Sequence, residues 1–282
     1  MTKKIINRYL STETYEAVKR DFGFLIKKIK ASGFEYELQI RDNYLNLYYK
    51  GNSLGKISYR KSADLYEIRI HRKFAEGIGS EINRFKNSQE KEYLLFTLAS
   101  KELHPFFSTR NLLLMGQKVK KVGFQEEIVF EQMLMADNAK REDLIIIDRQ
   151  VVDRNSSTKM DLLALKKKDA GKYQFCILEV KLGNNPELKG EVFTQLSGYI
   201  ARIENNFQAY KECYEKNVTQ KQGIGLLPVE INVTIVEDVL GFVVVGGYSG
   251  IGEQSIKELK GKHLDDIKVL HMKNVIDLNR AK

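Results

Sequence analysis

The stretch that decides the fold is MDLLAL (160–165), followed by a Lys-rich segment (166–171) and then FCILEVK (175–181). Two apolar runs of strand length flank a short polar segment that contains Asp-Ala-Gly, which predicts a β-hairpin. The second run is apolar almost throughout. We therefore expect it to be a central strand covered on both faces.

Three charged residues stand at one end of this hairpin. Glu179 and Lys181 are two residues apart, so on a strand their side chains point to the same face. Asp161 enters the first strand and can reach that face from the neighbouring strand. Buried charges are costly unless they are paired or bound to something. Asp161 and Glu179 could supply oxygen ligands for a divalent metal such as magnesium, beside Lys181.

Asp161, a gap, and then Glu179-Val180-Lys181 resembles the core motif of the PD-(D/E)XK nuclease superfamily, with Met160 in the place of the family's proline. QLSGY (195–199) resembles the Gln-x-x-x-Tyr helix motif of the RecB-type branch, in which the two residues share one helix face. The resemblance covers roughly residues 123–199. It implies an α/β fold, a restriction-endonuclease-like mixed sheet flanked by helices.

The resemblance also implies roles for individual residues. Asp161 and Glu179 would bind Mg²⁺ or Mn²⁺ together with the backbone carbonyl of Val180, and Lys181 would orient the attacking water. Gln195 and Tyr199 would position the nucleic-acid strand. Two alternatives stay open, in which Gln195 is an exposed helix residue and Tyr199 packs in the core.

A glutamate on the preceding helix is a further expected metal ligand in this superfamily. The helix predicted over 124–139 carries Glu126, Glu127 and Glu131. Distance from Asp161 favours Glu127, and Glu131, one turn along, is the alternative. The acidic residues could also simply favour the positive end of the helix dipole.

Composition indicates a folded protein of one large or two ordinary domains, since the 282 residues are 43% hydrophobic and 29% charged. We expect no membrane span, because no run of about 18 uninterrupted apolar residues occurs. The amino-terminal residues lack the long apolar segment of a secretion signal. Cys176 and Cys213 form neither a disulfide framework nor a metal-binding spacing. These features predict a cytoplasmic, reduced setting.

The net charge of +9 is spread unevenly. Residues 1–115 hold 21 Lys and Arg against 13 Asp and Glu, whereas residues 116–282 hold 25 against 24. We therefore predict a basic α+β domain over 1–115 that binds nucleic acid, and a nuclease domain over 116–282. A basic surface with no partner is the simpler alternative.

The first part should contain a helix over 11–31, an antiparallel meander and a second helix over 80–101. The meander strands are expected at 34–40, 44–49, 55–59 and 66–71. An aromatic and basic mixture on these strands could stack bases and hold phosphates, although β-propensity alone also explains the tyrosines. Its members are Tyr48, Tyr49, Tyr59, Arg60, Arg69, His71, Arg72 and Lys73.

The second part should alternate strands and helices. Strands are expected at 144–153, 239–245 and 267–272, and a helix from 186 into the 210s. Arg149 is expected to be exposed, and Asp153 is expected to be a strand or turn residue. The glycine-rich segment 246–252 is expected to be a tight strand-to-helix connection.

Together these features predict a metal-dependent nuclease that hydrolyses phosphodiester bonds of nucleic acid, with DNA the expected substrate and no membrane partner. One alternative is a non-catalytic nucleic-acid-binding protein that retains the nuclease fold. Another is a structural protein in which Asp161, Glu179 and Lys181 form only a buried ion network. A homodimer stays open.

Overall fold

The computed structural model describes residues 5–75, 82, 85, 87–122, 125–154, 158–227, 231–259 and 267–273. The chain folds as two compact units. The first combines Met1–Lys140 with Lys211–Ile231, and the second combines Arg141–Tyr210 with Asn232–Lys282. The boundary expected near residue 115 falls inside a helix, α6 (Thr109–Val122).

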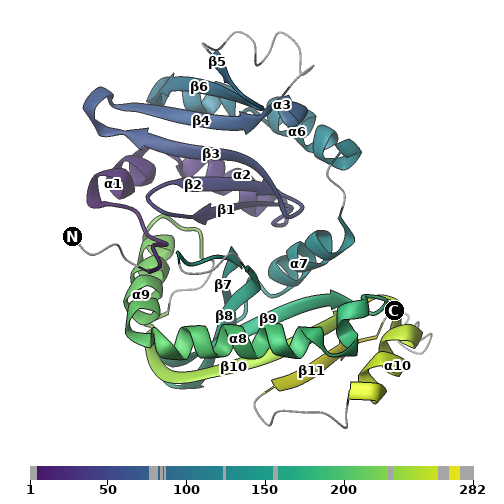
Figure 1. Cartoon of the computed structure of the whole chain (residues 1–282). Coiled ribbons are helices and arrows are strands. Elements are labelled where there is room, and N and C mark those ends of the chain that lie inside the picture. Colours follow the sequence, from purple (N-terminus) through teal and green to yellow (C-terminus); the bar gives the residue numbers. More distant parts are fainter. Residues whose placement is uncertain are drawn as a thin grey trace, which may run out of the picture. The chain divides into compact units, whose positions relative to one another are not determined.

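A six-stranded antiparallel sheet forms the centre of the first unit (Figure 1). The predicted four-stranded meander is present, and two further strands extend it in the order β1-β2-β3-β4-β6-β5. The strands are β1 (Tyr36–Ile40), β2 (Leu45–Tyr49), β3 (Asn52–Arg60), β4 (Leu65–His71), β5 (Asn87–Glu90) and β6 (Tyr93–Ala99).

The helix expected over 11–31 is instead two helices that break at Phe22, whose backbone leaves the helical region at φ −105° and ψ 2°. Ser11 caps the first of them, because its hydroxyl accepts a hydrogen bond from the Thr14 amide at 3.3 Å. Up to Lys140, the described helices of this unit are α1 (Thr12–Asp21), α2 (Gly23–Ala31), η1 (Lys61–Ala63), α3 (Arg72–Ala75), α5 (Ser100–Phe106), α6 and α7 (Glu126–Asp137).

The helix predicted over 80–101 is wrong at residues 87–99. These residues form the β5–β6 hairpin, whereas Ile82 before them is helical and helix α5 begins after them at Ser100. Phe96 and Leu98 are buried while Thr97 between them is exposed, which is the two-residue period of a strand. Pairing of β6 with β4 on one side and β5 on the other fixes the extended conformation. Residues 80, 81, 83, 84 and 86 lie outside the described part of the chain.

One face of this sheet packs against helices to form a continuous apolar core. Phe22 and Leu25 from the first two helices meet Tyr66 and Phe96 from the sheet, and Met115 of α6 joins them. The prediction that aromatic residues of the meander could stack bases is wrong for Tyr48 and Tyr49, because both side chains are buried.

The segment 211–231 belongs to the first unit through specific hydrogen bonds. The Gln220 side chain, on α9 (Phe207–Gly223), pairs with both backbone groups of Leu10, at 2.8 and 2.9 Å. The Lys221 ammonium donates to Gln39 Oε1 at 2.5 Å. These bonds satisfy buried polar groups on both segments, so a late part of the chain completes a unit begun by the first residues.

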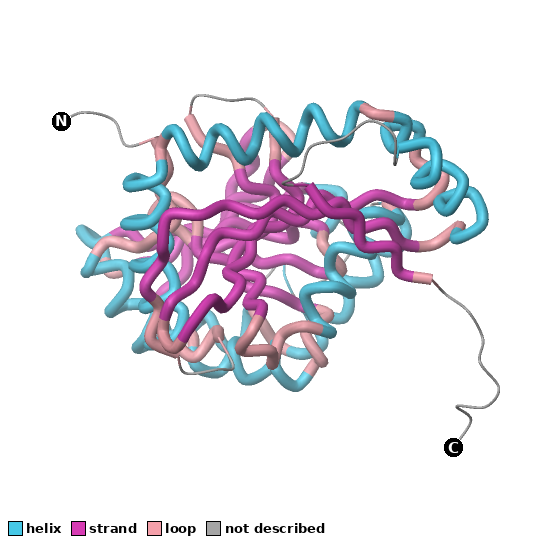
Figure 2. Tube along the Cα trace, turned by 90° about the horizontal axis from the view of Figure 1, so that it is seen from below, coloured by secondary structure: helices cyan, strands magenta, loops and turns pink. Residues whose placement is uncertain are grey.

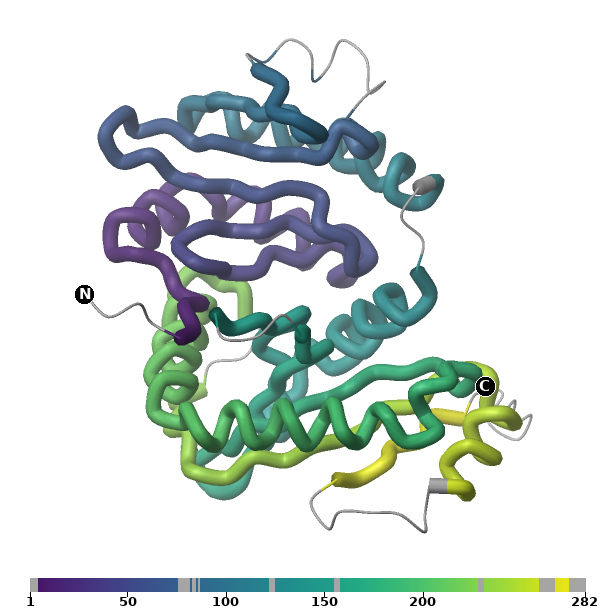
Figure 3. Tube along the Cα trace, in the orientation of Figure 1, coloured from purple at the N-terminus to yellow at the C-terminus, as the bar shows by residue number. Residues whose placement is uncertain are grey.

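A mixed five-stranded sheet forms the centre of the second unit, in the order β11-β10-β9-β8-β7 (Figure 3). β7, β8 and β9 run antiparallel to one another, whereas β9, β10 and β11 run parallel. The elements are β7 (Leu144–Val151), β8 (Met160–Asp169), β9 (Lys172–Leu182), η2 (Pro186–Lys189), α8 (Glu191–Asn205), the first turn of α9, β10 (Thr234–Gly246), α10 (Ser249–Leu259) and β11 (Ile267–Met272).

The predicted hairpin and the central position of its second strand are both confirmed. β8 and β9 pair from Leu162 opposite Leu178 to Asp169 opposite Lys172, with one shift of register between Lys167 and Asp169. Gly171 allows the turn, with φ +71°. β9 is buried at nearly every position, and a strand pairs with it on each side. Burial also raises the pKa of the Cys176 thiol to about 12, so this thiol stays protonated.

Helix α8 packs along one face of this sheet against β10 and β9, as the view from below also shows (Figure 2). The segment 246–252 connects β10 tightly to α10, as predicted. A Cβ atom on Gly183 would lie 2.6 Å from the Gly247 carbonyl oxygen. Only glycine therefore fits at position 183, where the chain after β9 runs past the turn between β10 and α10. Within the described residues, every helix is too short or too polar to cross a lipid bilayer.

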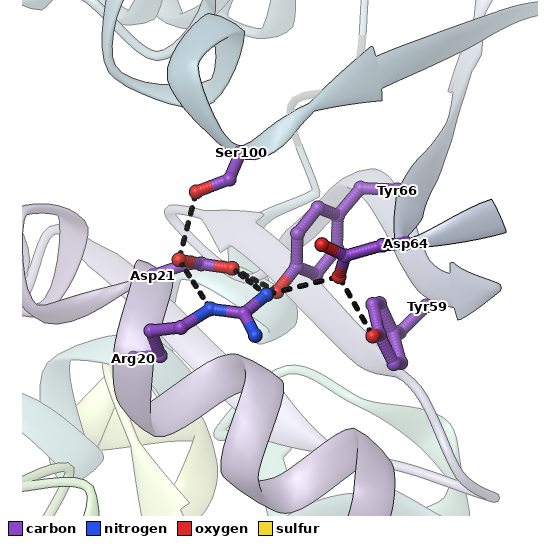
Figure 4. A network of polar contacts seen from close by, with 6 residues as sticks. All are labelled: Arg20, Asp21, Tyr59, Asp64, Tyr66 and Ser100. Carbon is purple, nitrogen blue, oxygen red and sulfur yellow. Dashed lines mark hydrogen bonds and ion pairs between the residues drawn. The ribbon is translucent and has the colours of Figure 1, made fainter. Parts of the chain in front are cut away.

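A polar network closes the edge of the core in the first unit (Figure 4). Asp21, whose side chain is 6% exposed, accepts hydrogen bonds from the Tyr66 and Ser100 hydroxyls at 2.7 Å and from the Arg20 guanidinium at 2.8 and 3.0 Å. Burial alone would raise the pKa of Asp21, but these three donors outweigh it and the net pKa is lowered.

We predict that Asp21→Asn lowers the free energy of unfolding at pH 7 by about 2 kcal/mol, because buried donors lose a charged acceptor. The folded pKa of Asp21 lies below the unfolded value of about 4. Its contribution is therefore present above the unfolded pKa and is lost as the pH falls through the folded pKa. Urea unfolding at pH 7 and pH 3 measures both effects.

Asp64→Asn is the matched control, since Asp64 is 63% exposed and contacts the same Arg20 at 3.1 Å. It should change stability much less. Equal losses in the two variants, or a wild-type advantage that does not shrink at pH 3, would contradict the role of Asp21.

Candidate active site

The β8–β9 hairpin brings the predicted charged residues together. Leu162 lies opposite Leu178, and the next residues outward are Asp161 and Glu179. The two carboxylates therefore come from neighbouring strands at the end of the hairpin. Glu179 and Lys181 are 2% and 7% exposed, so the predicted burial of charge is confirmed for both.

Local hydrogen bonds hold the two carboxylates in place. Asp161 Oδ2 accepts from the Val180 amide at 2.9 Å. The Glu179 carboxylate in turn accepts from the backbone amide of Asp161. This reciprocal pairing links the strand ends and leaves each carboxylate little rotational freedom.

Lys181 lies between two glutamates. Its Nζ is 3.0 Å from Glu179 Oε1 and 2.7 Å from Glu187 Oε2. Glu187 lies on η2, where Asn185 caps the turn by accepting from the Glu187 amide at 2.9 Å. Sequence reasoning missed Glu187, although Asn-Pro-Glu at 185–187 is a recognisable helix start.

The electrostatics of the cluster follow from this arrangement. Burial, reinforced by the charge of Asp161, raises the pKa of Glu179 to about 8. Burial alone would lower the pKa of Lys181, but Glu179 and Glu187 outweigh it and raise the pKa, so Lys181 is a cation. The hydrogen bond and charge of Lys181 lower the pKa of Glu187. The cluster is therefore one coupled ion network.

One acceptor atom in this network is left over. Glu179 Oε2 is buried and has no hydrogen-bond partner among the described residues. Buried polar atoms rarely stay unsatisfied in folded proteins. Over the same described residues, however, no group of three or more His, Cys, Asp and Glu side chains is placed to hold a metal ion. The described residues thus offer two adjacent carboxylates and one unpartnered oxygen, Glu179 Oε2, without a complete metal site made of side chains.

Helix α8 places Gln195 and Tyr199 beside the cluster. The Gln195 side chain is hydrogen-bonded to Glu187 and so supports the Lys181 ion pair. The Tyr199 hydroxyl donates to the Lys159 carbonyl at 2.8 Å. Burial and the nearby Glu179 and Asp161 charges raise the pKa of Tyr199. In this structure Tyr199 is buried and anchors the chain just before Asp161.

The two glutamates expected on the preceding helix belong to the first unit. Glu127 is half-buried and Glu131 is buried, both on α7. The same helix is tied to the first unit by Gln132 Nε2, which donates to the Phe34 carbonyl at 2.9 Å. A metal-binding role for either glutamate stays a prediction.

Strand β7 and the loop after it carry two charged residues, Arg149 and Asp153, for which the sequence analysis predicted no functional role. Arg149 is fully buried, so its expected exposure is wrong. Asp153 is also buried and accepts from the Tyr210 hydroxyl at 2.9 Å, with Arg202 Nε 3.7 Å away. These contacts make Asp153 a structural link between the β7–β8 connection and the two following helices.

Comparison of the chain with protein-family models, with curated proteins and with solved structures gives no match.

We predict that Tyr199→Phe lowers the free energy of unfolding by about 1 kcal/mol, because the Lys159 carbonyl loses its donor while the ring packing is kept. Thermal and urea unfolding measure this change. Weaker nucleic-acid binding at unchanged stability would instead favour the direct strand contact that the family resemblance implies.

Proposed function

We propose that this chain is a metal-dependent nuclease that hydrolyses phosphodiester bonds of nucleic acid, DNA in particular. The observation that carries the proposal is the juxtaposition of Asp161, Glu179 and Lys181 at the end of the β8–β9 hairpin, with Glu179 Oε2 buried and unpartnered among the described residues. The mixed sheet and the helix after its central strand support a restriction-endonuclease-like fold. The motif resemblance to the PD-(D/E)XK superfamily supports the same assignment.

The donor set fits a small hard cation. Magnesium is commonly held by one or two protein carboxylates, with water and substrate phosphate completing its shell. Asp161 and Glu179 would be those carboxylates, and the free Oε2 of Glu179 would be a natural ligand atom. The Val180 carbonyl and Glu127 remain further expected ligands. Bound magnesium or manganese would lower the pKa of a coordinated water to produce a nucleophile near neutral pH.

The chain's own groups supply the rest of the chemistry. Lys181 carries a positive charge into a buried site, where it would orient the attacking water and stabilise charge that develops on the phosphate. Glu187 and Gln195 would keep the Lys181 ammonium in position. Tyr199 would not react; its hydroxyl would fix the backbone at Lys159, just before Asp161.

The contact between Lys181 and Glu187 favours a second candidate, a structural ion network. A lysine between two carboxylates can be fully explained by pairing, without any reaction. A nucleic-acid-binding protein that retains the fold but does not cleave would have the same geometry. The two predictions below separate these candidates from the nuclease.

We predict that Asp161→Asn abolishes divalent binding, because one of two adjacent carboxylates is lost. Titration calorimetry with manganese measures the affinity. Asp238→Asn is a matched control in the same unit, since Asp238 pairs with Lys168 at the surface and should not affect the metal. Equal manganese affinity in wild type and Asp161→Asn would remove Asp161 from the ligand set.

We predict that Lys181→Met lowers the cleavage rate about 100–1000-fold while nucleic-acid binding is kept, because one preorganised cation is missing from the transition state. Wild type and variant are incubated with linear and circular, single- and double-stranded DNA, with and without magnesium or manganese. Lys168→Met, at the exposed pair with Asp238, is the control and should cleave normally.

Thermal unfolding of the same preparations completes this test. Lys181→Met leaves Glu179 and Glu187 without their cation. We therefore expect its melting temperature to fall whether the protein is a nuclease or the cluster is only a structural ion network. Wild-type cleavage that depends on Lys181 supports the nuclease. A fall in melting temperature, with no cleavage by wild type under any of these conditions, would leave only the ion network or the non-catalytic binder.

A further inference from the structure

The first unit contains a basic pocket on its six-stranded sheet, independent of the β8–β9 cluster. The pocket has a volume of about 450 Å³ and is lined from β2, β3, β4, β6 and α3. Its lining includes Lys56, Arg69, His71 and Lys73. None of its described lining residues is Asp or Glu. The volume lies in the ordinary range of small-ligand sites.

Two of the cations lie opposite each other on neighbouring strands of the sheet. Lys56 of β3 lies directly opposite Arg69 of β4, and Asn46 of β2 lies opposite Lys56 on the other side. Like charges directly opposite on neighbouring strands are destabilising. The fold therefore keeps a locally unfavourable pair at the centre of this pocket.

Aromatic rings hold these cations in place without neutralising them. Lys56 Nζ lies 4.2 Å from the centre of the Tyr44 ring, and the Arg69 guanidinium lies 4.3 Å from that of Tyr93. Such contacts fix the position of a cation but leave its charge unbalanced. Because the cations already cover these two ring faces, the rings are poorly placed to stack bases.

The nearby carboxylates do not balance this charge from inside the pocket. Glu90 lies 3.7 Å from Arg69 Nη2 and Glu92 lies 3.4 Å from His71 Nε2, and both glutamates are more than half exposed at the β5–β6 turn. Lys56 and Lys73 make no ion pair within the described part of the chain. In the same residues Arg69 Nε is buried and lacks a hydrogen-bond partner.

The backbone at the pocket is irregular where β2 pairs with β3. The pairing of β2 with β3 shifts between Leu47 and Tyr48, which leaves Leu54 as a bulge. Next to it, Asn46 Nδ2 donates to the Ser53 hydroxyl at 3.0 Å. Bulges are common next to binding sites, where they redirect side chains.

We infer that this pocket binds the phosphate group of a nucleotide, with Lys56 and Arg69 on either side of it and Lys73 at its edge. Phosphate offers several acceptor oxygens and up to two negative charges, which match a guanidinium and two ammonium groups. The pocket would accept the phosphate of a free nucleotide or of a nucleic-acid strand. In a strand it would bind with little preference for sequence, because phosphates carry no base identity.

The test uses the full chain in a buffer with EDTA, which prevents metal-dependent cleavage. Two probes are titrated, thymidine 5′-monophosphate by calorimetry and a short labelled oligodeoxythymidine by fluorescence anisotropy. We expect Lys56→Gln to weaken the affinity for the recognised probe about tenfold. For the oligonucleotide, the magnitude of the slope of log affinity against log salt should decrease by about 0.7, because one phosphate contact is lost.

Lys27→Gln is the matched control, because Lys27 is an exposed lysine on α2 and lies outside the pocket. It removes the same charge from the same unit and should leave the affinity and the salt slope unchanged. Lys56→Gln should not lower the melting temperature, since it removes one of two facing like charges. Lys73→Gln is a second variant whose loss of affinity should be in the same direction.

The two probes distinguish the sources of the phosphate. Loss of oligonucleotide binding in Lys56→Gln supports the pocket as a contact for a strand. Loss of monophosphate binding alone supports a free nucleotide as its ligand. If neither probe binds, or if Lys56→Gln binds both as tightly as Lys27→Gln does, the pocket is not a phosphate site.

Discussion

The second unit depends on how charge is compensated on a strand that is buried on both sides. β9 pairs with β8 and β10, yet it carries Glu179 and Lys181 near its end. An unpaired charge at this depth would cost several kcal/mol. The η2 turn therefore brings Glu187 within 2.7 Å of Lys181, and α8 supplies Gln195 to Glu187. The loop and the helix after β9 are placed by this requirement.

Sequence patterns could predict the part of this arrangement that depends on near neighbours. The hairpin, its central strand and the shared face of Glu179 and Lys181 follow from two-residue periodicity. Glu187 was missed because its partner is six residues away across a turn, and no periodicity relates the two. The exposure of Arg149 was predicted wrongly for the same reason, since its burial depends on segments distant in sequence.

The first unit shows the limits of periodicity more plainly. The apolar run at 93–98 is compatible with a helix face or with a buried strand. It forms a strand because it pairs with β4. α6 was missed, although Leu112, Met115 and Val119 are spaced as one helix face and are buried. The return of residues 211–231 to this unit rests on long-range bonds such as Gln220 to Leu10, which no local pattern encodes.

The two charged clusters balance their charge in different ways. In the second unit Lys181 lies between two carboxylates, and among the described residues Glu179 Oε2 is left without a partner. In the first unit Lys56 lies opposite Arg69, and the carboxylate that pairs with Arg69, that of Glu90, is exposed at the β5–β6 turn. Among the described residues, carboxylates balance the charge of Lys181, whereas Lys56 has no carboxylate partner. The basic excess of residues 1–115 is therefore partly concentrated at one pocket, and this uncompensated charge among the described residues is the reason why we infer an anionic ligand there.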